Sequence, residues 1–152
     1  MLRLPPPIWA LVYVLLTAGI SWALGWPRLL GLPSPLLGVE LVALASILPI
    51  WAIVLFKRAG TEVNPTSVAN RELITSGPYK VLRHPSYLGM LLLAIGAGAV
   101  WGNWLGLGVL TLLTLAGVAY RIHVEERALL EELGDRYRSY AEHHKRLIPF
   151  VW

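Results

Sequence analysis

The chain has 152 residues, of which 56% are hydrophobic and only 14% are charged, and its formal net charge is +4. Its mean hydropathy of +0.60 lies well above that of an average soluble protein, which favours the bilayer as the solvent. The chain contains no cysteine, which excludes disulfides, thioether-linked haem and thiolate metal sites.

Four apolar segments are candidates for membrane-spanning helices, which need about 20 mostly apolar residues and somewhat fewer in a tight hairpin. In chain order they cover residues 8–26, 36–56, 87–101 and 104–120. Only Gly102 and Asn103 separate the last two, which predicts a helical hairpin. The patterns Gly98-x-x-x-Gly102 and Gly102-x-x-x-Gly106 flank this turn and favour close approach of its two helices. The sequence therefore predicts a single all-α integral membrane domain over residues 1–152.

Two features of the first two spans leave alternatives open. The first span has a second interpretation as a cleaved signal peptide, because Arg3 precedes it and Ser21-Trp22-Ala23 resembles a cleavage site. Its apolar run is longer than that of a usual signal peptide, which favours retention. In the second span Glu40 is costly in lipid, so we expect it to face protein or water, or to lie near the helix end at the interface.

The basic residues are unevenly divided between the predicted loops. Eleven of the thirteen lie in residues 57–86 or 121–152, whereas Arg28 is alone in the opposite loops and Arg3 precedes the first span. Because cytoplasmic loops collect Lys and Arg, this distribution predicts both termini and both polar segments on the cytoplasmic side of a bacterial inner membrane. The positive charge then reflects orientation and contact with anionic lipid, so we expect no nucleic-acid partner.

The first polar segment, 57–86, is longer than a connector needs, and long ordered loops are usually functional. Its last ten residues begin the motif GPYKVLRHPSYLG, residues 77–89, which runs into the third span, and Gly77-Pro78 indicates a turn. Pro85 restricts the backbone of His84 at the start of the third span. No strand followed by a glycine-rich turn occurs, so neither a Rossmann site nor a P-loop is predicted.

The second polar segment continues the fourth span. Apolar and aromatic residues recur there at helical spacing between charged residues, namely Ile122, Leu129, Leu133, Tyr137 and Tyr140. This pattern predicts an amphipathic cytoplasmic helix that runs on from the membrane. We expect Gly134 to break or bend it.

Taken one at a time, the polar residues of these segments have ordinary interpretations. Arg83 and His84 could mark the cytoplasmic end of a span, with snorkelling side chains. Arg121 and Glu125 could form a surface pair one helical turn apart. Glu126 could belong to a solvated face. A functional interpretation depends on their joint occurrence.

Taken together, LITSGPYKVLRHPSYLG, a helical hairpin, RIHVEE, LGDRYRSY and RLIPF resemble the isoprenylcysteine carboxyl methyltransferase family. The chain resembles the phospholipid methyltransferases more loosely, and the similarity covers about residues 60–150. The resemblance implies a small membrane enzyme that binds S-adenosylmethionine without a Rossmann domain and releases S-adenosylhomocysteine. It also implies that the cofactor lies in a cytoplasmic pocket between the Arg83-His84-Pro85 loop and the helix that follows the last span.

Carried over residue by residue, the resemblance implies cofactor contacts at Asn64, Arg71, Glu72, Leu73, Ile74, Tyr79, His84, Pro85, Ser86, Tyr87 and Glu125. At position 64 the family tends to have a longer amide. The charges of the cofactor agree with this set, because Glu125 can pair its ammonium group, while Arg83 and His84 can approach its carboxylate. Leu73, Ile74 and Tyr79 can sandwich its adenine.

The methyl acceptor is open at this point. Arg121 matches the family's substrate-binding arginine and could orient a carboxylate, which is already ionised and needs no base. An amine acceptor must lose a proton, for which Glu126 or His123 is available. We favour carboxyl O-methylation of a lipophilic, isoprenylcysteine-like acceptor, with phospholipid amine N-methylation as the alternative. Another lipid carboxylate or a small thiol also stays open as the acceptor.

A noncatalytic membrane carrier or subunit is the alternative of a different class. His143 and His144 have no acidic partner at metal-binding spacing, so we expect no metal site. We expect the lipid bilayer as a partner of the chain, and no obligate protein partner.

Overall fold

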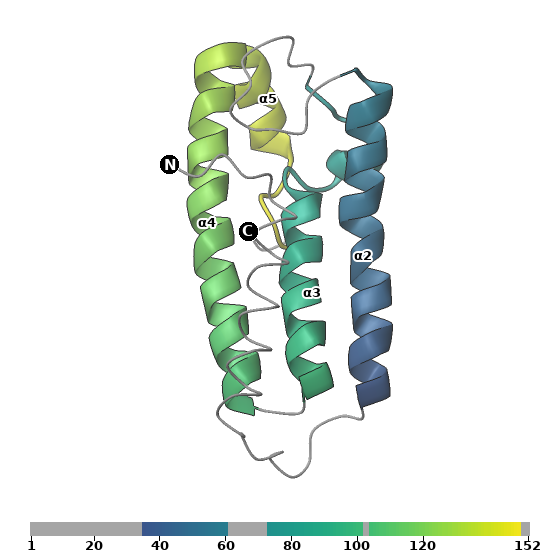
Figure 1. Cartoon of the computed structure of the whole chain (residues 1–152). Helices are drawn as coiled ribbons and strands as arrows, with labels where there is room; N and C mark the ends of the chain where they lie inside the picture. The colour runs from purple at the N-terminus through teal and green to yellow at the C-terminus, as the bar shows by residue number, and fades with distance from the viewer. Residues whose placement is uncertain (1–34, 61–72, 102–103, 150–152) are drawn as a thin grey trace. The chain divides into compact units, whose positions relative to one another are not determined.

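The structure, a computed structural model, describes residues 35–60, 73–101 and 104–149 (Figure 1). Its elements are α2 (Pro35–Arg58), the short 3-10 helix η1 (Gly77–Lys80), α3 (Pro85–Trp101), α4 (Trp104–Leu133) and α5 (Asp135–His143). Within these ranges the only extended pairing is an isolated bridge between Leu82 and Lys145. The described part of the chain is therefore all-helical, as predicted, while the proposed first span lies outside it.

The helices follow the apolar pattern of the sequence closely. The second predicted span becomes α2, and the third becomes α3, which begins two residues early at Pro85 because proline suits the first helical position. The fourth continues as α4 to Leu133, where Gly134 ends it with a φ of 52° that favours glycine. The predicted helical extension of the fourth span and its break at Gly134 are therefore confirmed, while the cytoplasmic location of this extension stays a prediction.

Two of these helices are long and apolar enough to cross a membrane. Gly38–Arg58 has a hydropathy of 2.4 and Leu107–Leu133 a hydropathy of 1.6, whereas Pro85–Val100 is apolar but shorter. Length and composition thus support spans at α2 and α4. The predicted count of four spans stays a prediction.

The chain divides into two compact units. The first comprises Met1–Ile47 and Gly89–Val118, and the second comprises Leu48–Leu88 and Ala119–Trp152. Helices α2, α3 and α4 each contribute residues to both units. The single domain over residues 1–152 stays a prediction.

Small residues let the helices of the first unit approach closely. A Cβ atom on Gly96 of α3 would lie 3.0 Å from the backbone nitrogen of Val42 on α2, and one on Gly98 would lie 2.8 Å from Cα of Leu107 on α4. Ala94 and Ala97 pack with Leu110 in the same unit. Gly98 therefore permits the close approach of α3 and α4 that the sequence indicated.

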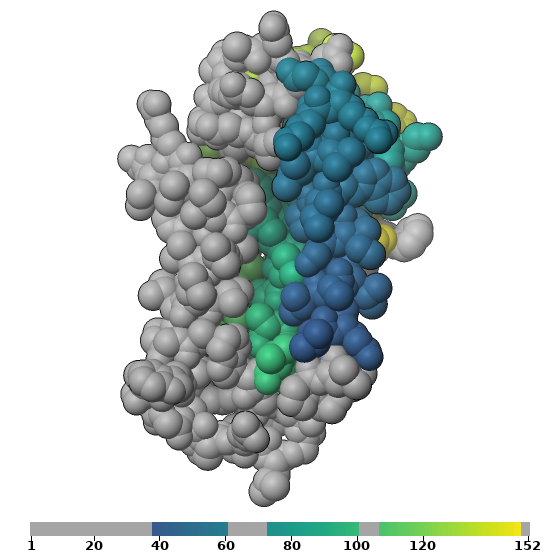
Figure 2. Space-filling model, turned by 45° about the vertical axis from the view of Figure 1, so that its right-hand side comes forward, coloured from purple at the N-terminus to yellow at the C-terminus, as the bar shows by residue number. Residues whose placement is uncertain are grey.

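The outer face of α2 in the first unit is apolar. Figure 2 shows the side chains of α2 open on one side of the molecule, and Val39, Leu44 and Ile47 are all exposed. Glu40 is also exposed, in the second turn of the helix. This position agrees with the helix-end alternative for Glu40.

Candidate functional site

The site begins where η1 packs on the end of α2 within the second unit. Gly77 has a φ of 59°, and a Cβ atom there would lie 3.0 Å from Leu55 and 3.3 Å from Trp51, so glycine fits both the turn and the contact. Tyr79 is buried, with its ring edge-on to Phe56 at a centroid distance of 5.9 Å. Burial, followed by the charge of Glu125, raises the pKa of Tyr79, so its hydroxyl stays protonated at neutral pH.

A loop of residues 81–84 connects η1 to α3, and His84 is its last residue. Its carbonyl accepts hydrogen bonds from the backbone nitrogens of Tyr87 at 3.1 Å and Leu88 at 3.3 Å, which begins the helix. The residue is only 4% exposed, and its ring lies 5.6 Å from that of Tyr87. His84 is thus a buried side chain at the start of α3, and the interpretation of it as a snorkelling residue is wrong.

Glu125 comes to this junction from α4. The hydroxyl of Tyr87 donates a hydrogen bond of 2.9 Å to Oε2 of Glu125, and Nδ1 of His84 lies 4.0 Å from the same oxygen. About forty residues separate Glu125 from these partners along the chain. The two polar segments predicted to meet therefore do so.

Glu126, the next residue of α4, lies inside a cluster formed by two arginines and His84. Its Oε1 is 2.7 Å from Nη1 of Arg83 and 3.4 Å from Nε2 of His84. Its Oε2 accepts a hydrogen bond of 3.0 Å from Nε of Arg146. The residue is 7% exposed, so the interpretation of Glu126 as part of a solvated face is wrong. The reason is tertiary: its partners are 20 or more residues away along the chain.

The motif RLIPF entered only the family resemblance, and no role in the site was predicted for the segment after α5. We call residues 144–149 the C-terminal strap. Its Lys145 and Arg146 carbonyls accept hydrogen bonds from the backbone nitrogens of Arg83 at 2.8 Å and His84 at 3.0 Å, and Leu147 is fully buried. The short apolar run RLIPF after the helix break was the available signal. The strap therefore holds the loop that carries His84.

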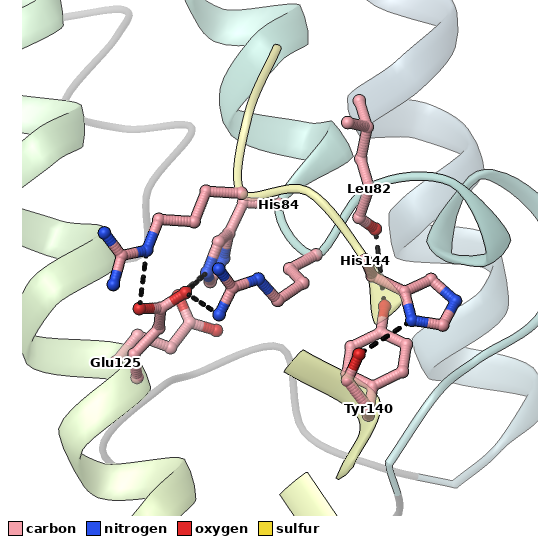
Figure 3. A network of polar contacts seen from close by, with 8 residues as sticks. Leu82, His84, Glu125, Tyr140 and His144 are labelled. Carbon is pink, nitrogen blue, oxygen red and sulfur yellow. Dashed lines mark hydrogen bonds and ion pairs between the residues drawn. The ribbon is translucent and has the colours of Figure 1, made fainter. Parts of the chain in front are cut away.

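Tyr140 of α5 binds the same loop near η1, where the loop begins. Its hydroxyl donates a hydrogen bond of 2.7 Å to the carbonyl of Tyr79 and lies 3.4 Å from the carbonyl of Leu82. The ring of His144 stacks on that of Tyr140 at 4.2 Å, and its Nδ1 lies 2.8 Å from the Tyr140 carbonyl. Figure 3 shows Tyr140 and His144 grouped below Leu82, with His84 and Glu125 in the neighbouring polar cluster.

The remaining predicted residues differ in how directly they join this cluster. Leu73 and Ile74 are half-buried just before η1, and Ser86 is half-buried in the first turn of α3 beside the buried Pro85. Arg121 is half-buried on α4, one turn before Glu125. Three further predicted cofactor contacts lie outside the described residues, namely Asn64, Arg71 and Glu72.

The phospholipid methyltransferase family matches residues 34–136. Protein-S-isoprenylcysteine O-methyltransferase B of Arabidopsis thaliana is 30% identical over 115 residues, which are 75% of this chain and 58% of that protein. Methanethiol S-methyltransferase 2 of Bradyrhizobium diazoefficiens is 29% identical over 96% of this chain and 51% of that protein.

A solved structure gives the same assignment. It is that of the eukaryotic intramembrane Ras methyltransferase, the isoprenylcysteine carboxyl methyltransferase, with a TM-score of 0.67 and 27% identity over 95% of this chain and 51% of that one. The chain thus spans about half the length of these relatives. Its helical fold and its motifs are similar to those of membrane methyltransferases. The chain belongs to the phospholipid methyltransferase family and is similar to the isoprenylcysteine carboxyl methyltransferases, the family that the sequence motifs indicated.

Proposed function

We propose that the chain is an S-adenosylmethionine-dependent membrane methyltransferase that acts on a lipophilic acceptor, by carboxyl O-methylation of an isoprenylcysteine-like substrate. The observation that carries this proposal is the convergence of His84 and Tyr87 with Glu125, from motifs about forty residues apart. The family membership supports the reaction class. Apolar α2 and α4 support a location in the membrane, and the distribution of basic residues supports a site on the cytoplasmic side.

The residues around Glu125 fit the chemistry of the cofactor. The Glu125 side chain is 23% exposed against 9% for Glu126, so a cation can approach Glu125 while Glu126 is enclosed by protein cations. Half-buried Leu73 and Ile74 precede the buried Tyr79 and offer apolar surface for an adenine. When bound, S-adenosylmethionine supplies a methyl group on a sulfonium cation. The chain's own contribution is to hold donor and acceptor in attack geometry.

The state of Glu126 bears on the choice of acceptor. Two guanidinium groups within 3.0 Å favour its ionised form, and this makes the carboxylate a weak proton acceptor. An amine acceptor would need a base, and His123, the other candidate, is on an exposed part of α4. A carboxylate acceptor needs none, and Arg121 is placed one turn from Glu125 to orient it. The cluster therefore favours the carboxylate over the phospholipid amine.

A thiol is the second candidate acceptor. The methanethiol S-methyltransferase relative matches 96% of this chain, a larger share than the 75% matched by the isoprenylcysteine enzyme. A thiol has a pKa of about 8.5, so only a small fraction is ionised at pH 7 and this chemistry gains from a base. The carboxylate remains the preferred acceptor because it is fully ionised.

Binding of S-adenosylhomocysteine to the purified protein in detergent tests the cofactor. We expect saturable binding by calorimetry, weakened at least about tenfold by Glu125→Ala, the loss expected for a charge-assisted contact. His84→Ala should weaken it too. Glu131→Ala is the matched control, because Glu131 lies on the same helix but is exposed. Absence of binding, or equal loss in the control, would refute the proposal.

Product chemistry tests the acceptor. Membranes that contain the protein are incubated with methyl-labelled cofactor, and the lipid and protein fractions are treated with base. A methyl ester releases volatile methanol, whereas a methylated amine or thioether keeps its label. Label that resists base in every fraction would exclude the carboxylate acceptor, and a volatile labelled thioether would establish the thiol. An amine product would remain with the lipid.

A further inference from the structure

The C-terminal strap reaches the candidate site by two separate routes. Through its backbone, the carbonyl oxygen of Arg146 accepts a hydrogen bond of 3.0 Å from the backbone nitrogen of His84. Through its side chain, Nε of Arg146 donates to Glu126, whose other oxygen lies 3.4 Å from Nε2 of His84. Both the backbone and the ring of His84 are therefore tied to one residue of the strap.

The two carboxylate oxygens of Glu126 contact different residues. Oε1 contacts Arg83 and the His84 ring, while Oε2 is held by Arg146. A carboxylate fixed through only one oxygen can rotate about its terminal bond, since that torsion is broad. The contact of Arg146 with Oε2 restricts this rotation and so fixes the direction of Oε1 toward His84.

We infer that Arg146 is a positioning residue that acts through Glu126 to orient the buried ring of His84 in the cofactor site. The inference rests on the proposed function for the meaning of that site, but its geometry involves protein groups alone. Arg146 itself is 43% exposed at its side chain, whereas Glu126 and His84 are buried, so the guanidinium closes the cluster from its solvent side. The C-terminal strap therefore forms one wall of the site.

The first test is equilibrium binding of S-adenosylhomocysteine to the full-length protein. We expect Arg146→Ala to raise Kd about fivefold, the low end for a charge-assisted hydrogen bond whose cation is half exposed. Arg146→Lys should recover most of the affinity because it keeps the charge. Arg138→Ala is the control, since Arg138 is 69% exposed and pairs with Asp135 at 3.7 Å on the surface of the same unit. An equal loss in the control would overturn the inference.

A double-mutant cycle tests whether the effect passes through Glu126. In a Glu126→Gln background, Arg146→Ala should change Kd by less than about twofold, the usual limit of additivity for independent changes. The same fivefold loss in both backgrounds would show that Arg146 acts without Glu126, and the inference would be wrong.

The ring signals of histidine provide a readout that needs neither cofactor nor the Glu126 variant. The chain has four histidines, so ring-nitrogen NMR of the ¹⁵N-histidine-labelled protein gives few signals, and His84→Ala identifies that of His84. Arg146→Ala should shift the His84 signal without ligand, while Arg138→Ala should not. An unchanged signal overturns the inference. Failure of the wild-type protein to bind S-adenosylhomocysteine would instead overturn the proposed function, so the two failures are distinguishable.

Discussion

The hydroxyl of Tyr140 provides a direct test of how α5 holds the loop of the candidate site. It donates a hydrogen bond of 2.7 Å to the Tyr79 carbonyl, and both groups are buried. Tyr140→Phe removes this bond and retains the ring, so packing is almost unchanged. A net neutral hydrogen bond contributes about 1 kcal/mol, and the buried carbonyl left short of a donor adds a similar cost, giving about 1–2 kcal/mol in all.

Tyr137 offers a matched control on the same helix. It is also buried, but its hydroxyl has no hydrogen-bond partner among the described residues. Tyr137→Phe therefore removes an unsatisfied polar group, and we expect it to be neutral or stabilising. The two substitutions are chemically identical, so their difference isolates the hydrogen bond.

Hydrogen exchange measured by mass spectrometry reports the effect locally. The backbone nitrogens of Arg83 and His84 donate to the strap, so peptides that cover them should be protected in the wild-type protein. A loss of about 1–2 kcal/mol lowers that protection roughly 5- to 30-fold in Tyr140→Phe. Unchanged protection, or an equal fall in Tyr137→Phe, would refute the reasoning.

Two further predictions concern packing and pH. Gly98→Ala places a Cβ atom 2.8 Å from Cα of Leu107, so we expect a lower melting temperature. Gly117→Ala is the control, because a Cβ atom there meets nothing within 4 Å. It should raise the melting temperature, since alanine stabilises a helix by up to about 1 kcal/mol relative to glycine. A Gly98→Ala protein as stable as the wild type would contradict the close approach. Burial, followed by the charge of Glu126, raises the pKa of Tyr137 to about 12, against about 10 in the unfolded chain. Below pH 10 this hydroxyl is neutral in both states, and between pH 10 and 12 it ionises only in the unfolded chain, which favours unfolding. The melting temperature should therefore fall across that range, and less steeply in Tyr137→Phe.

The sequence by itself determined the helices and their ends. The apolar runs gave α2, α3 and the first part of α4, because bilayer-length hydrophobic segments satisfy their backbone hydrogen bonds internally. Gly77 and Gly134 marked a turn and a helix end, and both have positive φ values. These are local properties that the identity of a few neighbouring residues decides.

The motifs also indicated which polar residues would meet, but not how. The pairing of Tyr87 with Glu125 agrees with the resemblance that the sequence carried. The placement of Glu126 inside a cluster of two arginines and His84 did not follow from its helical position beside Glu125. Neighbours in a helix point about 100° apart, and only the tertiary structure shows what each one faces.

The tertiary structure alone decided the role of the C-terminal strap. No periodicity connects Arg146 to Glu126 or to the backbone of His84, because these contacts close loops of 20 and 62 residues. The physical reason is that a buried carboxylate and two buried amide groups need partners, and the chain supplies them from wherever the fold brings it close. The sequence thus determined the helices and the residue types of the site, and tertiary packing determined which of them are bound to one another.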